Sequence, residues 1–394
     1  MNGVHTRIAA AVRDLGDRLW DVATDLHANP ELAFAEHYAA GRLTAELSAA
    51  GFTIDRPVAG LDTAFTGRFG DGGPATVALL LEYDALPELG HACGHNLIAA
   101  AGLGAALALA HALPEPGGTV LAVGTPAEEG GGGKVILTER GVFDGVDAAL
   151  MFHPAGHTWT SATLTAFTEI RMTMRGKAGH PTGDRGIAVN ALDALLRAFL
   201  AATAENDRLP PGGNVHGIIT AGGTRTNIVP DYAEARLALR SPTTAGLDGL
   251  CATVTAHAHR AAAEVGAVAE VVRDGPAYDH FRANDPLAER FGRHLAAAGL
   301  PPAPSRPEVV VGSSDIGNVS TVVPAIHPLV AIVDEDVSDH TPEFAAAAAG
   351  PRARTALLAA TEALARTAAD VLLDPGLRDA AHAAFARERD NDSR

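Results

Sequence analysis

The chain has 394 residues, enough for two domains of ordinary size and a large apolar core. Its formal net charge of −17 argues against a nucleic-acid partner, because binding to the phosphate backbone requires a basic surface. Two cysteines, Cys93 and Cys251, are too few and too far apart for a disulfide framework, which favours a reducing compartment.

The first residues and the longest apolar run bear on localisation. Charged side chains interrupt residues 1–21 and leave no apolar segment for a secretory signal. The longest uncharged apolar run, 97–110, is shorter than the roughly 20 residues that span a bilayer, and it predicts a buried helix. We therefore expect a cytoplasmic protein with no membrane partner.

Residues 1–166 combine helical periodicity with short apolar runs typical of buried strands. Strands that alternate with helices in this way predict a largely parallel sheet covered by helices on both faces. Helices are expected at 8–26, 36–50, 97–113 and 134–140, and strands at 52–54, 63–69, 76–81, 119–123 and 148–152.

The pattern changes at Phe167. Ile170, Met172 and Met174 alternate with polar residues, which is typical of a half-exposed strand, and an amphipathic helix follows. The complete order of elements is β-α-β-β-α-β, a ferredoxin-like arrangement. The later elements are a helix at 192–200, strands at 215–220 and 232–239, a helix at 246–265 and a strand at 268–272.

The α/β pattern resumes after the insertion. A helix is expected at 286–298, strands at 308–311 and 328–333, and a helical region at the end of the chain. The sequence thus predicts an α/β domain in two parts, 1–166 and 278–394, split by an inserted domain at 167–277.

The first chemical cluster lies between a predicted strand and the helix at 97–113. Open α/β sheets gather their ligand-binding loops at such strand ends. Cys93 and His95 stand two residues apart there, and a thiolate with an imidazole suits a transition metal such as zinc. Taken alone, the stretch fits equally well a small buried cysteine with incidental histidines.

Two carboxylates, Glu128 and Glu129, follow the predicted strand at 119–123. Adjacent residues in an extended loop point to opposite sides. One carboxylate can therefore bind a metal while its neighbour takes a proton from the attacking water. A solvated acidic loop is the alternative interpretation.

Two histidines extend the pattern. His153 follows the predicted strand at 148–152, and His340 precedes Thr341-Pro342, a combination typical of a helix start. A single histidine of this kind is more often a surface or core residue than a ligand. The prediction of a metal site depends on four separate strand ends or loops converging.

Together these stretches resemble the aminoacylase and carboxypeptidase-G superfamily of metallopeptidases (clan MH). The resemblance is greatest to its hippurate hydrolase and aminobenzoyl-glutamate hydrolase branch, with its dipeptide-cleaving amidohydrolases. It covers almost the whole chain in the right order. The matching segments are Leu26-His27-Ala28-Asn29-Pro30-Glu31-Leu32, Tyr83-Asp84-Ala85-Leu86-Pro87, residues 91–96, 124–129, Gly176-Lys177-Ala178-Gly179-His180, residues 226–231 and Gly312-Ser313-Ser314-Asp315.

The resemblance implies a divalent metal centre with one or two ions per subunit, zinc or manganese. In the wider superfamily a His-x-Asp pair helps to hold one metal, and here Glu82 replaces its histidine. This difference is shared with the hippurate hydrolase branch and leaves the metal count open. The implied roles are a bridging ligand for Cys93, further ligands for His95, Glu129, His153 and His340, and the general base for Glu128.

For the inserted domain, the resemblance implies a lid and a dimerisation surface, and hence a homodimer. His180 resembles the histidine that reaches the partner subunit's site and stabilises the tetrahedral oxyanion. Asn227 and Arg240 resemble residues that hold the substrate carboxylate, a task suited to the planar guanidinium of arginine. For Arg240, an ordinary charge at a strand end is an equally good interpretation.

The sequence therefore predicts a metal-dependent amidohydrolase acting on N-acyl amino acids, aminobenzoyl-glutamate-like amides or dipeptides. One alternative is a metal-free cysteine hydrolase, with Cys93 as nucleophile and His91 or His95 as base. Another is a catalytically silent binding or regulatory protein on the same fold. The first leaves three candidate ligands without a role, and the second leaves the complete set of ligands and base unexplained.

Overall fold

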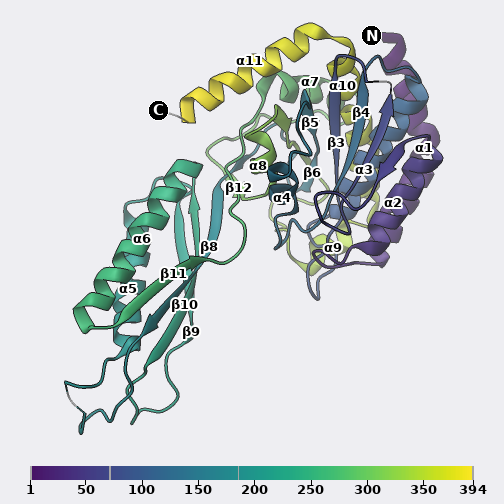
Figure 1. The fold of residues 1–394 in the computed structure, drawn as a ribbon. Helices are drawn as coiled ribbons and strands as arrows, with labels where there is room; N and C mark the ends of the chain where they lie inside the picture. Colours follow the sequence, from purple (N-terminus) through teal and green to yellow (C-terminus); the bar gives the residue numbers. More distant parts are fainter. Residues whose placement is uncertain (1, 71, 185, 393–394) are drawn as a thin grey trace. The chain divides into compact units, whose positions relative to one another are not determined.

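The computed structural model describes residues 2–70, 72–184 and 186–392, which divide into two compact units (Figure 1). The first unit comprises the described parts of 1–163, 281–311 and 315–394. The second comprises the described parts of 164–280 and the short segment 312–314.

A six-stranded sheet with the order β1-β2-β4-β3-β5-β13 is the centre of the first unit. Strands β4, β3, β5 and β13 run parallel, whereas β1 and β2 form an antiparallel edge. The parallel strands are almost entirely buried, as expected for a sheet of this kind. The bounds are β1 (Thr53–Asp55), β2 (Phe65–Gly70), β3 (Thr76–Glu82), β4 (Thr119–Thr125), β5 (Ala148–Leu150) and β13 (Ala325–Ile326).

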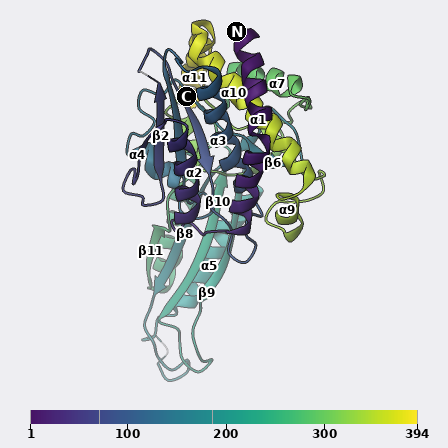
Figure 2. The same ribbon diagram turned by 90° about the vertical axis from the view of Figure 1, so that its right-hand side faces the viewer.

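Helix α3 (His95–Ala112) is the core helix of this unit. It is long and apolar enough to cross a membrane, but 89% of it is buried within the protein, where it packs against α1, α10 and β3 (Figure 2). The buried helix predicted from the sequence is thereby confirmed. The other helices are α1 (Asn2–Ala28), α2 (His37–Ala49), α4 (Gly133–Glu139), α7 (Asp285–Ala297), α8 (Ile316–Ser320), α9 (Pro342–Ala347), α10 (Pro351–Leu373) and α11 (Pro375–Asp392).

The second unit has the predicted β-α-β-β-α-β order. Its four antiparallel strands lie in the order β11-β8-β10-β9, and helices α5 and α6 pack against them. Ile170, Met172 and Met174 are buried in its core. The bounds are β8 (Ala166–Arg175), α5 (Ala191–Thr203), η1 (Ala204–Asp207), β9 (Asn214–Ala221), β10 (Tyr232–Ser241), α6 (Thr244–Val265) and β11 (Val268–Arg273).

The mixed α/β fold class is confirmed, but the sequence missed several short elements. Of the run at 148–152, predicted as one strand, only Ala148–Leu150 form β5. A separate strand, β6 (His153–Ala155), follows and pairs with β14 (Leu329–Ala331) outside the main sheet. Helix α8 and strand β13 were not foreseen, because segments of two to five residues are too short to show a period. A pair of short strands, β7 (Thr163–Leu164) and β12 (Val310–Gly312), completes the set.

A buried charge network joins three helices of the first unit. Asp370 on α10 accepts hydrogen bonds at 2.7 Å from His5 of α1, and from His294 and Arg290 of α7. This Asp and the two histidines have the spacing of a metal site, but the guanidinium of Arg290 already supplies a cation at the carboxylate. The cluster is therefore an ion-pair network.

We predict that Asp370→Asn destabilises the fold most at neutral pH. Although burial raises the pKa of Asp370, the bonds from His294 and Arg290 outweigh it and lower the pKa to about 2. A depressed carboxyl pKa stabilises the fold above the ordinary value of 3.8, and this contribution of about 2 kcal/mol is lost as the pH falls from 4 to 2.

The measurement is urea unfolding of the wild type and the variant at pH 7, 4 and 2.5. The difference in unfolding free energy should shrink towards acid pH. Asp379→Asn, an exposed carboxylate on α11, is the matched control and should show little difference at any pH. A constant difference across the range would contradict the assignment of the low pKa.

Candidate metal centre

The turn at the start of α3 brings the candidate ligands Cys93 and His95 close together. Gly94 adopts a left-handed conformation between Cys93 and His95, with φ of 79°, and a Cβ at this position would lie 2.9 Å from the ring of Pro154. Only glycine fits such a turn without strain. Cys93 Sγ lies 3.4 Å from His153 Nε2, and the ligand atoms of Cys93, His95 and His153 lie within 4.8 Å of one another.

The end of β4 adds the two glutamates. Ala127 has a left-handed φ of 61°, and Glu128 and Glu129 follow it. The ligand atoms of His95, Glu128 and Glu129 lie within 4.8 Å of one another, and so do those of Cys93, Glu129 and His340. The structure therefore brings all six residues predicted for this centre into one cluster.

His340 enters the cluster from a loop near the end of the chain. Its backbone is left-handed, with φ of 57°, and its N–H donates to the carbonyl of Ala92 at 3.0 Å. The next residue, Thr341, caps α9 by accepting from Phe344 N at 3.3 Å, which confirms the predicted helix start. His340 Nε2 lies 3.4 Å from Glu129 Oε1, and its side chain is 49% exposed, so it forms the open side of the cluster.

Asp84, directly after β3, orients two of the candidate ligands. Its Oδ1 lies 3.1 Å from His95 Nδ1, and its Oδ2 accepts from Glu129 N at 2.9 Å. Because Nδ1 of His95 is engaged, Nε2 is the nitrogen left for a metal. The resemblance gave Asp84 only as the second position of the metal-holding His-x-Asp pair, and its contacts with His95 and Glu129 were not predicted.

The first unit also contains a buried ion-pair triad that was not predicted from the sequence. Lys134 is fully buried and donates to Glu82 and, at 2.7 Å, to Asp315. Although burial lowers the pKa of Lys134, Asp315 and Glu82 outweigh it and keep the ammonium charged. The available signal was that the chain has only two lysines and that one of them follows a run of glycines at the start of the helix predicted at 134–140.

The cluster fits a cation. Among the described residues, three buried atoms of the cluster and its surroundings have no hydrogen-bond partner: His95 Nε2, Glu129 Oε1 and Glu82 Oε1. His95 Nε2 lies 3.1 Å from Glu82 Oε1, at ion-pair distance. Unpaired buried polar atoms are costly, and a shared cation would satisfy them. A thiol, imidazoles and carboxylates form a donor set that suits zinc or another first-row transition metal.

Electrostatics distinguish the two adjacent glutamates. Burial raises the pKa of Glu128, and the neighbouring charges of Glu82, Asp315 and Glu129 raise it further. Burial also raises the pKa of Glu129, but the nearby imidazoles of His340 and His95 outweigh it and lower the pKa overall. Glu129 is thus suited to remain a carboxylate ligand, and Glu128 is suited to take up a proton.

The other three predicted residues belong to the second unit. His180 accepts at Nδ1 from Thr182 N and Gly183 N, at 3.2 and 3.1 Å. Its Nε2 therefore carries the proton and can donate to an oxyanion. Asn227 lies in an exposed loop that is tied to the His180 segment by a bond from Val229 N to Gly179 O at 2.9 Å.

Arg240 on β10 is held by two contacts within this unit. It donates to Ser313 Oγ at 2.6 Å, and its guanidinium lies 4.6 Å from the ring centroid of Phe167. Burial lowers its pKa. An arginine with no carboxylate partner among the described residues retains the capacity to bind an anionic group.

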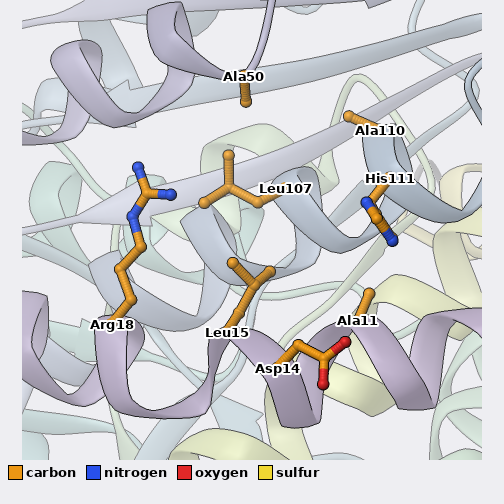
Figure 3. A pocket seen from close by; sticks show the side chains of 8 residues that line it. All are labelled: Ala11, Asp14, Leu15, Arg18, Ala50, Leu107, Ala110 and His111. Carbon is orange, nitrogen blue, oxygen red and sulfur yellow. The ribbon is translucent and has the colours of Figure 1, made fainter.

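The first unit also contains a pocket of about 440 Å³ (Figure 3). Figure 3 shows Arg18 and Leu15 of α1 and Leu107 of α3 around it. None of the candidate ligands lines this pocket. It is therefore separate from the metal centre.

Comparison with known proteins places the chain in a family. The peptidase dimerisation domain family matches residues 165–266. Xaa-Arg dipeptidase of Mus musculus is 36% identical over 396 residues, which cover 96% of this chain and 91% of the relative. The chain belongs to the M20 metallopeptidase family. The human Xaa-Arg dipeptidase is 34% identical over 94% of this chain and 89% of its own length.

Solved structures have the same fold. A putative aminohydrolase from Staphylococcus aureus matches with a TM-score of 0.76, 22% identity and coverage of 93% of this chain and 100% of its own. A Bacillus subtilis protein described as a dinuclear metal binding peptidase of the M20 family matches with a TM-score of 0.72, 22% identity and coverage of 92% and 99%. The family and the reaction class predicted from the motifs, metal-dependent hydrolysis of an amide or dipeptide bond, are confirmed.

We predict that Cys93→Ala lowers metal occupancy, because it removes a ligand atom shared by two groups of candidate ligands. In the wild type, bound metal should also protect the Cys93 thiol from alkylation. Cys251 on α6 provides an internal control, since its alkylation should not depend on metal. Full metal occupancy combined with lost activity in Cys93→Ala would favour the nucleophile interpretation instead.

Proposed function

We propose that the chain is a divalent-metal dipeptidase that cleaves the amide bond next to a free carboxylate, with Glu128 as general base. The observation that carries the proposal is the half-buried Glu128 with its raised pKa, in one cluster with His95 and Glu129. Sequence identities of 36% and 34% to Xaa-Arg dipeptidases over almost the whole chain support dipeptides that end in arginine as the first substrate class to test.

For the metal centre, we assign Cys93, His95, Glu129, His153 and His340 as ligands. Cys93 belongs both to the group with His95 and His153 and to the group with Glu129 and His340. With Cys93 in both groups, these residues would hold one or two ions, and zinc or manganese would suit the donors. When bound, such ions polarise the scissile carbonyl and acidify a water molecule.

The protein residues then move the proton. Glu128 takes it from the attacking water and passes it to the departing amine, acting first as base and then as acid. Its carboxylate lies beside the candidate ligands His95 and Glu129, and its raised pKa favours uptake of a proton. Asp84 keeps His95 and Glu129 in place during the reaction.

We assign the residues of the second unit to substrate and transition state. Asn227 and Arg240 would hold the substrate carboxylate, and the Nε2–H of His180 would stabilise the oxyanion of the partner subunit's site. A homodimer is supported by the matching dimerisation family and by β9, an edge strand on which Ile218 and Ile219 are 59% and 42% exposed. A cytoplasmic location remains part of the proposal.

The decisive experiment is a hydrolysis screen of the zinc- and manganese-loaded protein. Dipeptides ending in Arg or Lys, other dipeptides, N-acyl amino acids and aminobenzoyl-glutamate should be compared. We predict activity on dipeptides and a loss of roughly 10² to 10⁴-fold in Glu128→Gln with metal content unchanged, as expected for removal of a general base. No turnover of any substrate, or equal loss of metal and activity in the variant, would refute the assignment.

We also predict that His180 acts across the dimer. If it does, mixing inactive His180→Ala with inactive Glu128→Gln subunits recovers activity, because each heterodimer has one site with an intact base and an intact histidine. Differently tagged chains are needed to establish that subunits exchange. Heterodimers without recovered activity would show that His180 does not serve the partner subunit.

A further inference from the structure

The backbone just before the general base is held in an unfavourable conformation. Ala127 precedes Glu128 and is left-handed, with φ of 61°. For a residue other than glycine, this conformation is unfavourable, because the Cβ comes too close to the following carbonyl oxygen. Ala127 is fully buried, and its carbonyl accepts from Gly131 N at 3.0 Å, so that residues 127–131 form a closed turn. Contacts outside the turn must therefore stabilise it.

The carboxylate of Glu36 supplies such a contact. Its Oε1 accepts from Ala127 N at 2.9 Å, although the two residues are 91 positions apart in the chain. Glu36 is fully buried and stands at the start of α2, yet among the described residues its side chain caps no N–H of that helix. Glu36 Oε1 instead accepts a hydrogen bond from the first residue of the turn at 127–131.

The same oxygen fixes a second left-handed residue. Phe34 has φ of 62°, and its N–H donates to Glu36 Oε1 at 2.9 Å. The Phe34 ring lies against Gly131, where an added Cβ would come within 2.3 Å of the ring. Glu36 thus holds the first residue of the turn directly and, through Phe34, contacts its last.

We propose that Glu36 is a positioning residue for the turn that carries Glu128 and Glu129. By holding Ala127 in its left-handed conformation, it fixes the directions in which the next two side chains leave the backbone. Its effect on turnover rests on the proposed role of Glu128, whereas its effect on the turn does not. A displacement of about 1 Å at a catalytic group is enough to lower a rate by a factor of roughly 100.

The test compares Glu36→Ala, Glu36→Gln and the double variant Glu36→Ala/Ala127→Gly. Glu36→Ala should lower kcat roughly 10- to 100-fold with KM within about threefold. Glu36→Gln retains a carbonyl oxygen that can accept the same two N–H groups, so its kcat should stay within about threefold of wild type. Glycine at 127 removes the left-handed penalty and should restore kcat about 3- to 10-fold in the double variant.

Glu46→Ala is the matched control. Glu46 is another buried glutamate of α2, paired with Arg42 and Arg18, so its loss should lower stability but leave kcat of the folded protein unchanged. Ala127→Gly in the wild-type background controls for the added flexibility of glycine. All variants should be compared at a temperature at which each is folded.

A second measurement is independent of activity. Amide hydrogen exchange of the metal-free protein should be faster at residues 127–131 in Glu36→Ala than in wild type or in Glu46→Ala. Unchanged exchange there, unchanged kcat in folded Glu36→Ala, or loss of kcat in folded Glu36→Gln would each overturn the proposal. If Glu36→Ala does not fold, a loss of kcat in folded Glu36→Gln would still overturn the proposal. Faster exchange in a protein that is inactive on every substrate would support the positioning role and count against the proposed function alone.

Discussion

The candidate centre depends on one shared carboxylate. Asp84 contacts the imidazole of His95 with one oxygen and the backbone N–H of Glu129 with the other. It thereby ties together the end of β3, the start of α3 and the loop after β4. A carboxylate in this position sets the orientation of the ligands before any ion binds, which lowers the entropic cost of assembling the site. The surrounding residues can be understood as keeping this carboxylate in place.

The parallel sheet explains why residues so far apart in sequence meet. The carboxyl ends of β3, β4 and β5 lie at the same edge of the sheet, and the loops that leave them contain Asp84, Glu128 and His153. Crossovers through α3 and α4 return the chain to the opposite edge each time, so that β4 and β5 run parallel to β3. The site is thus a consequence of the topology, and the sequence adds only the side chains.

The sequence allowed prediction of the residues whose position follows from the topology, but not of the contacts between individual side chains. Cys93, His95, Glu128 and His153 could be brought together because each follows a recognisable apolar strand or precedes a recognisable helix, and strand ends have a known common edge. The contacts of Asp84 and Lys134 were not predicted, because nothing local in the sequence shows which partner a buried charge has. Glu36 is an extreme example, since its hydrogen-bond partner Ala127 lies in a different loop and gives no signal of its own. The conformation of Ala127 was equally hidden, because alanine is not a residue expected at positive φ.

The order in which the chain is synthesised gives the position of His340 a further meaning. Cys93, His95, the two glutamates and His153 all precede the second unit in sequence, whereas His340 follows it. His153 also depends on late residues, since its N–H donates to Pro328 O at 2.8 Å and its strand pairs with β14. A nascent chain that has emerged only as far as the second unit therefore lacks both the last candidate ligand and the strand that supports another. On the proposed ligand set, a chain stalled on the ribosome or clipped before His340 would be marked by weak ion binding.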